Sequence, residues 1–118
     1  MFFLNMTITV EDINNGAIVR ISGEVDLSVS PEVKEKILEQ IELNRKENNF
    51  TIPKSVYADL SEVSYIDSSG IASLIHSHQH AAKSGVNFYL FKTSTGVLKV
   101  IQLARLDSIF KLVDSIQE

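Results

Sequence analysis

Apolar and polar residues alternate in the first part of the chain, and this pattern predicts a β-hairpin. The stretch "TITVE" at residues 7–11 places Ile8 and Val10 on one face, and "AIVRIS" at residues 17–22 alternates in the same way. Between them, "DINNG" carries the Asn and Gly residues that tolerate the positive φ of tight turns. We therefore expect two antiparallel strands at the start of the chain.

The next stretch has helical periodicity, and its start signals place the first helical turn at Ser30. Ser30 is the predicted N-cap, Pro31 suits the first helical position, and Glu32 adds an acid to the first turn. Charged residues separate the apolar positions, so we expect one buried face and one solvated acidic face. The predicted buried positions are Val33, Ile37, Leu38 and Ile41.

Strands and helices alternate in the rest of the chain. A surface loop is predicted at residues 44–54, and a helix with apolar positions from Ile71 should stop at Gly85. Strands are expected at residues 55–60, 86–91 and 108–113. A further helix from Ser94 to about Arg105 would bury Val97, Leu98, Ile101 and Ala104.

This order of elements predicts the fold class. Strands that alternate with helices indicate an α/β layer with crossover connections. We expect a mixed sheet of four to five strands, with the helices packed mainly on one face. A chain of 118 residues with 44% hydrophobic content suits one core, so residues 1–118 are predicted to form a single domain. The closing "DSIQE" has room for barely one helical turn.

Composition argues against several classes of function. The net charge of −4 and the absence of a Lys or Arg run disfavour a nucleic-acid partner. The chain has no cysteine, which excludes disulfides and thiolate chemistry. The opening "MFFLNM" lacks a basic segment and a cleavage site, and no apolar run is long enough for membrane insertion. We expect a cytoplasmic protein that needs no cofactor.

The tetrapeptide "DSSG" at Asp67–Gly70 lies between a predicted strand and a predicted helix. Asp67 or Ser68 would serve there as an N-cap, whose side-chain oxygen accepts hydrogen bonds from backbone N–H groups that have no partner within the helix. Capping explains one polar residue better than two serines followed by Gly70. A glycine in the first helical turn costs about 1 kcal/mol relative to alanine, and it persists where something approaches the backbone closely.

Serine catalysis fits this motif poorly. The nucleophile elbow of hydrolases has glycines two residues before and after the serine, whereas Ile66 and Gly70 flank Ser68. A triad also needs a positioned histidine. The only histidines are His76, His78 and His80, further along the same predicted helix. We therefore expect a protein that is not an enzyme.

The three histidines also predict no metal site. His76 and His80 share a helical face, but His78 points to the opposite, apolar side. Two ligands without a third make a weak site. We expect His76 and His80 to be solvated and His78 to be packed.

Reversible phosphorylation is the third interpretation of the motif. A phosphate at a helix N-terminus interacts favourably with the helix dipole and would add nearly two negative charges beside Asp67. Asp26 would add to this charge if the end of the hairpin lies alongside. Against one partner carboxylate about 5 Å away, each added charge costs roughly 3 kcal/mol at an effective dielectric of about 20. Such a modification would switch a binding site off.

The stretches "GEVD" at residues 23–26 and "DLSEVSYIDSSGI" at residues 59–71 resemble the STAS domains of bacterial anti-sigma factor antagonists, and the similarity extends over nearly the whole chain. The resemblance implies that Ser68 is phosphorylated by a partner anti-sigma factor that is itself an ATP-dependent serine kinase. It implies that the unphosphorylated form binds this partner and releases a sigma factor, and that a PP2C-type phosphatase restores this form. The implied partner-binding residues are Asp26, Asp67, Ser69, Gly70 and Ile71.

Two other functions remain open from the sequence. One is an accessory STAS protein that is never phosphorylated and belongs to a sensory complex or a lipid transporter. The other is a nucleotide-binding module, although the chain lacks a glycine-rich phosphate loop.

Overall fold

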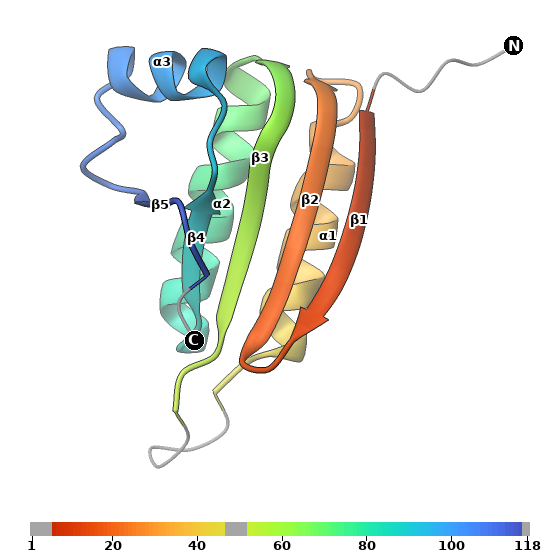
Figure 1. Cartoon of the computed structure of the whole chain (residues 1–118), viewed down its shortest axis with the longest axis vertical. Coiled ribbons are helices and arrows are strands. Elements are labelled where there is room, and N and C mark those ends of the chain that lie inside the picture. The colour runs from red at the N-terminus through yellow and green to blue at the C-terminus, as the bar shows by residue number, and fades with distance from the viewer. Residues whose placement is uncertain (1–5, 47–51, 117–118) are drawn as a thin grey trace, which may run out of the picture.

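The computed structural model describes residues 6–46 and 52–116, and Figure 1 shows these residues as one mixed five-stranded sheet with three helices. The strands are β1 (Met6–Ile13), β2 (Gly16–Val25), β3 (Ser55–Ile66), β4 (Asn87–Phe91) and β5 (Lys111–Val113). The helices are α1 (Ser30–Leu43), α2 (Ser68–Ser84) and α3 (Thr95–Leu103). The predicted α/β class is confirmed, with five strands rather than four.

Strand order follows chain order, β1-β2-β3-β4-β5, and only the first pair is antiparallel. β1 and β2 form the predicted hairpin in continuous register from Met6 opposite Gly23 to Ile13 opposite Gly16. β2 and β3 run parallel, so their carboxyl ends meet at the same edge of the sheet. Val25 pairs there with Ile66, which brings the "GEVD" and "DSSG" stretches together.

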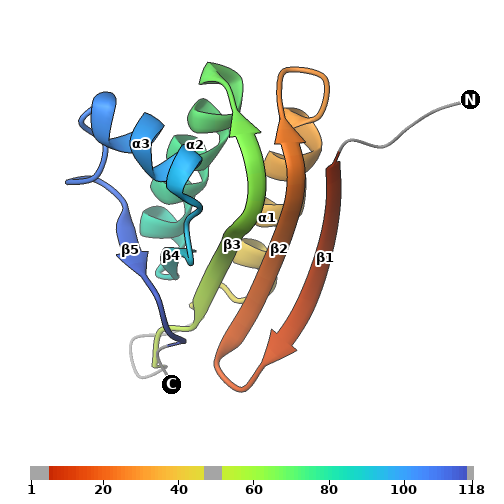
Figure 2. The same cartoon turned by 45° about the horizontal axis from the view of Figure 1, so that its top comes forward.

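Helices α1 and α2 pack on the same face of the sheet, behind the strands in Figure 1 and in the turned view of Figure 2. The main core lies between them, and its α1 side consists of Val33, Ile37 and Ile41, with Leu38 half-buried. The predicted helical periodicity of α1 and the predicted position of the helices on one face are confirmed. α3 covers the carboxyl end of β3 (Figure 2).

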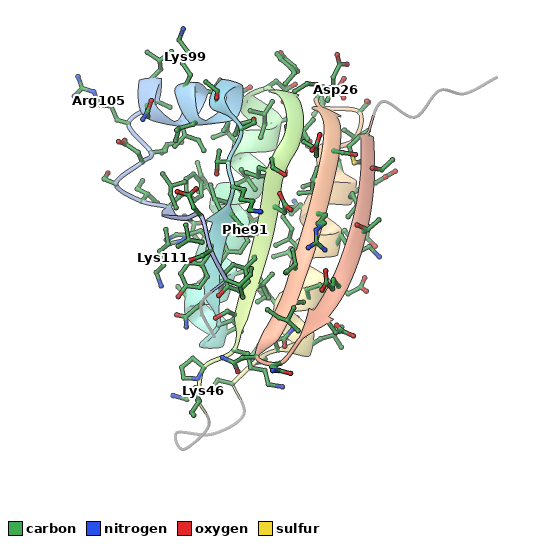
Figure 3. All side chains as sticks on the ribbon, viewed as in Figure 1. Asp26, Lys46, Phe91, Lys99, Arg105 and Lys111 are labelled. Atoms are coloured by element: carbon green, nitrogen blue, oxygen red, sulfur yellow. The ribbon has the colours of Figure 1, made fainter. Side chains whose placement is uncertain are left out.

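The face of the sheet opposite α1 and α2 carries a smaller apolar cluster of Ile18, Tyr57 and Phe91 (Figure 3). Ile116 packs against this cluster from the end of the described chain. Residues 114–116 form no helical turn, and the rest of "DSIQE" lies outside the described residues.

Two local predictions at helix ends are wrong. The N-cap of α1 is Val29, and Ser30 is already helical, because the Asp26 carbonyl accepts the Ser30 amide at 2.8 Å and starts the turn earlier. Ala104 is exposed because α3 stops at Leu103 and the chain turns away through Arg105, with φ 59°. The predicted stop of α2 at Gly85 is confirmed, with φ 69°.

The pairing of β3 with β2 is irregular near the motif. The register shifts between Arg20 and Ser22 and again between Gly23 and Glu24, as expected of bulges that increase strand twist. Ser94 stabilises this part of β3, because its amide donates to the Leu60 carbonyl at 3.3 Å and its hydroxyl donates to the Val63 carbonyl at 2.7 Å. The same hydroxyl caps α3 by accepting the Val97 amide.

The predicted loop at residues 44–54 falls partly outside the described residues. Its described parts, 44–46 and 52–54, belong to no helix or strand and are exposed or half-buried. Those parts agree with a surface loop at the end of the molecule opposite the motif (Figure 1).

Candidate functional site

Asp67 organises the start of α2. It is the N-cap, and its Oδ1 accepts the amides of Ser69 at 2.9 Å and Gly70 at 3.1 Å, together with the Ser69 hydroxyl at 2.5 Å. The Ser69 hydroxyl is the largest cause that lowers the pKa of Asp67, and the amides of Gly70, Ser69 and Leu27 act in the same direction. The carboxylate is therefore ionised and firmly held at neutral pH.

The two serines of the motif differ in environment. The Ser69 side chain is half-buried and its hydroxyl is bonded to Asp67. Ser68 is exposed, and its hydroxyl makes no hydrogen bond within residues 6–46 and 52–116. The hydroxyl that an enzyme can reach and modify without breaking a native contact is that of Ser68.

This difference predicts unequal stability effects for two alanine variants. We expect Ser69→Ala to lower the midpoint of thermal unfolding by roughly 4–8 °C, because it removes a hydrogen bond to a charged acceptor. Ser68→Ala should leave the midpoint unchanged. Circular dichroism melts of both variants measure this, and equal midpoints would show that the Ser69 hydroxyl contributes nothing.

Asp26 lies in a turn of the same design. Its Oδ1 accepts the Ser28 amide at 2.9 Å and the Ser28 hydroxyl at 2.5 Å, just as Asp67 accepts those of Ser69. Asp59 and Ser61 repeat the arrangement within β3. The spacing Asp-x-Ser occurs in the sequence at all three places, so this local structure has a sequence signal that the predictions above did not include.

The ends of β2 and β3 bring the two acids to one edge of the sheet. The Asp67 amide donates to the Val25 carbonyl at 3.1 Å, and the amide of Leu27, which follows Asp26, is close enough to the Asp67 carboxylate to help lower its pKa. Neither Asp26 nor Asp67 forms an ion pair with a Lys or Arg in the described part of the chain. Figure 3 labels Asp26 at this edge. The juxtaposition expected if the hairpin end lies alongside the motif is present.

Gly70 is required by the packing of the protein itself. A Cβ at this position would lie 2.5 Å from Cγ1 of Ile66 and 2.9 Å from Cγ1 of Val25, so the close approach comes from the two strands. Ile71 is 7% exposed and belongs to the main core. The implied docking role of Gly70 and Ile71 thus meets a physical obstacle, because both lie beneath the surface and offer a partner no exposed side chain.

The histidines of α2 have separate environments. His76 is exposed, and His78 packs edge-on against Phe110 at 6.0 Å between ring centroids, as predicted. His80 is not simply solvated, because its Nε2 lies 2.6 Å from Oε1 of Glu42 and this contact is the largest cause that lowers the pKa of Glu42. No group of three or more potential metal ligands occurs among the residues that the structure describes.

The lowered pKa of Asp67 predicts a pH-dependent stability. Folding favours the ionised form, so the stabilisation is fully present above the ordinary pKa of 3.8 and is lost as the pH falls through the lower folded value. We expect wild type to melt at a higher temperature than Asp67→Asn at neutral pH, with a difference that shrinks below pH 3.8. Thermal melts across this range test the prediction. A difference that stays constant with pH would contradict it.

No helix in the described part of the chain meets the length and apolarity that crossing a membrane requires.

Comparisons with known proteins agree with this geometry. The protein is 28% identical over 114 residues to the anti-sigma-F factor antagonist RsfB of Mycobacterium tuberculosis. The aligned residues cover 97% of this chain and 86% of the relative. An anti-sigma factor antagonist from Mycobacterium paratuberculosis has the same fold, with a TM-score of 0.78 at 24% identity over 94% of this chain and 87% of that one. Unphosphorylated SpoIIAA gives a TM-score of 0.71 at 18% identity over 94% and 90% of the two chains. The model of the STAS domain family matches residues 7–118, and the chain therefore belongs to this family.

Proposed function

We propose that the protein is an anti-sigma factor antagonist switched by phosphorylation of Ser68. Its unphosphorylated form binds an anti-sigma factor that is also a serine kinase and thereby releases a sigma factor in the cytoplasm. Phosphorylation ends the binding, and a PP2C-type phosphatase restores it. The observation that carries the proposal is the Ser68 hydroxyl, which is exposed and unbonded in the described structure at the N-terminus of α2. The relative named as an anti-sigma-F factor antagonist supports it.

The protein acts as a substrate in the proposed reaction. The Ser68 oxygen attacks the γ-phosphorus of ATP, a new O–P bond forms, the bond to ADP breaks, and the serine proton passes to a base of the kinase. Asp67 is a poor candidate for that base, because its carboxylate already accepts three hydrogen bonds and its pKa is lowered. Catalysis therefore belongs to the kinase, and this chain is not an enzyme.

The phosphate would change the surface without disturbing the fold. A phosphoserine carries about −1.5 to −2 charges, which the N-terminus of a helix accommodates favourably. A kinase that transfers phosphate to Ser68 brings its nucleotide phosphates and a carboxylate base to this point, so the product faces negative charge. SpoIIAA, which shares the fold, is known in unphosphorylated and phosphorylated forms.

The proposed contacts with the kinase come from Asp26, Asp67 and Ser69, which are half-buried around Ser68. Gly70 and Ile71 contribute from below by fixing how closely α2 approaches β2 and β3. This assignment separates residues that would touch the partner from residues that hold the site in place.

Mass spectrometry tests the proposal. The protein is incubated with ATP and each purified anti-sigma factor kinase of its source organism, and the modified residue is located by fragmentation. We expect one phosphate on Ser68, none on Ser68→Ala, and removal by a PP2C-type phosphatase. Absence of phosphate, combined with co-purification of a sensory complex or a transporter ATPase, would overturn the switch and favour an accessory STAS protein. Calorimetric binding of ATP or GTP to the protein alone would favour a nucleotide-binding module.

A further inference from the structure

Two large apolar side chains are exposed at the edge of the sheet that carries the motif. Leu27 is 72% exposed and Tyr65 is 53% exposed. Leu27 lies in the turn between β2 and α1, and Tyr65 lies at the end of β3. Leu27 directly follows the stretch "GEVD", and Tyr65 stands two residues before "DSSG".

The turn that carries Leu27 is held by a dense set of hydrogen bonds. The Asp26 carbonyl accepts the amides of Val29 at 3.1 Å and Ser30 at 2.8 Å, and the Asp26 carboxylate accepts the amide and hydroxyl of Ser28. Leu27 therefore projects into solvent from an ordered backbone. A partner that buries this side chain has little loop entropy to overcome.

Tyr65 is also held in place through its backbone. It pairs with Glu24 of β2, next to the pair of Val25 with Ile66, whose side chains are buried in the main core. Tyr65 and Glu24 are both exposed, whereas their neighbours Ile66 and Val25 are buried in the main core. The ring is thus presented at a fixed position with most of its apolar surface in water.

Both residues belong to segments that adjoin Ser68. Leu27 lies two residues after Val25, whose carbonyl accepts the amide of Asp67 at 3.1 Å, and Asp67 directly precedes Ser68. Tyr65 stands two residues before Asp67 at the end of the same strand. Leu27, in the turn after β2, and Tyr65, near the end of β3, thus flank the segment that carries Ser68.

Three acidic residues adjoin Leu27 and Tyr65, since Glu24 pairs with Tyr65, Asp26 precedes Leu27, and Asp67 follows Tyr65 by two residues. Glu24, Asp26 and Asp67 form no ion pair with a Lys or Arg in the described ranges of the chain. Carboxylates without a cationic partner favour a partner protein whose surface is positively charged. Such charge complementarity speeds association and disfavours other partners. The side chains that complement Glu24 and Asp26 are therefore Lys and Arg.

We propose that Leu27 and Tyr65 are the apolar anchors of the docking surface around Ser68. The partner that fits is a protein surface with two apolar recesses bordered by Lys and Arg, which surround the anionic centre that faces the serine. This inference rests on the proposed function for the identity of the partner as the kinase. Tyrosine is one of the residue types that carry a large share of the affinity of many interfaces, and burial of the Leu27 side chain would add the free energy of removing its apolar surface from water.

Variants of the two anchors test the inference in a binding assay with the kinase. Leu27→Ser and Tyr65→Ser should each weaken binding by about 10- to 100-fold. In both variants the maximal rate of Ser68 phosphorylation should stay the same, whereas a higher concentration of kinase should be needed to reach it. The matched control is Leu43→Ser, because Leu43 is 70% exposed at the opposite end of α1. If Leu27→Ser and Tyr65→Ser bind as tightly as Leu43→Ser, the inference is wrong.

A peptide-display experiment tests the same surface without any kinase. A phage library is selected on wild type and counter-selected on the Leu27→Ser/Tyr65→Ser double variant. We expect peptides that combine Lys or Arg with large apolar residues, that lose at least about 10-fold in affinity on either single variant, and that tolerate Leu43→Ser. If no such peptides are selected, the inference that Leu27 and Tyr65 are apolar anchors is wrong. If no kinase phosphorylates Ser68, the proposed function fails while this selection still decides the role of Leu27 and Tyr65.

Discussion

Ser68→Asp is expected to weaken binding to the kinase by about 100-fold or more, whereas Ser68→Ala should bind as tightly as the unphosphorylated protein. The new carboxylate would face the anionic centre of the kinase, and a like charge about 5 Å away costs roughly 3 kcal/mol at an effective dielectric of about 20. Alanine removes a hydroxyl that has no partner in the described structure, so it changes neither fold nor charge.

Isothermal titration calorimetry of wild type and both variants with the kinase measures this difference. Ser108→Asp is the control, since it places the same charge on an exposed serine between α3 and β5, outside the motif. The loss on Ser68→Asp should shrink at high salt, because ions screen charges that solvent can reach. Equal affinities of Ser68→Asp and Ser68→Ala would remove the electrostatic basis of the switch.

Gly70→Val is expected to destabilise the protein by about 2–3 kcal/mol, which corresponds to a fall of roughly 10–20 °C in the unfolding midpoint. The first added carbon would already lie 2.5 Å from Ile66 and 2.9 Å from Val25, and both neighbours are stiff β-branched residues of the core. Relief of this clash must push α2 away from the sheet and move Ser68 with it.

The control for Gly70→Val is Ala72→Val on the same helix. Ala72 is exposed, so the variant has the helical cost of a β-branched residue without the clash. Chemical denaturation of both variants gives the two free energies of unfolding. If both variants lose the same free energy of unfolding, the close contact of Gly70 with Ile66 and Val25 does not decide which side chains fit at position 70.

The fold was largely predictable from the sequence because its signals are local. Alternation marks β1 and β2, the turn chemistry of "DINNG" joins them, and helical spacing marks the buried positions of α1. The stop of α2 at Gly85 follows from the left-handed conformation that glycine adopts readily. The end of α3 was misjudged at Ala104, because apolar spacing alone does not show where a helix stops.

The sequence by itself determined where the polar motif stands, at a junction of strand and helix, and the resemblance singled out Ser68. Only the tertiary structure showed that Ser69 is bonded to Asp67, that Gly70 meets two strands, and that Leu27 and Tyr65 remain exposed beside them. These facts depend on the parallel pairing of β2 with β3, which joins segments far apart in the chain. A local sequence pattern indicates which secondary structure a segment prefers. Which side chains remain exposed to solvent is decided by the segments that pack against them in the folded protein.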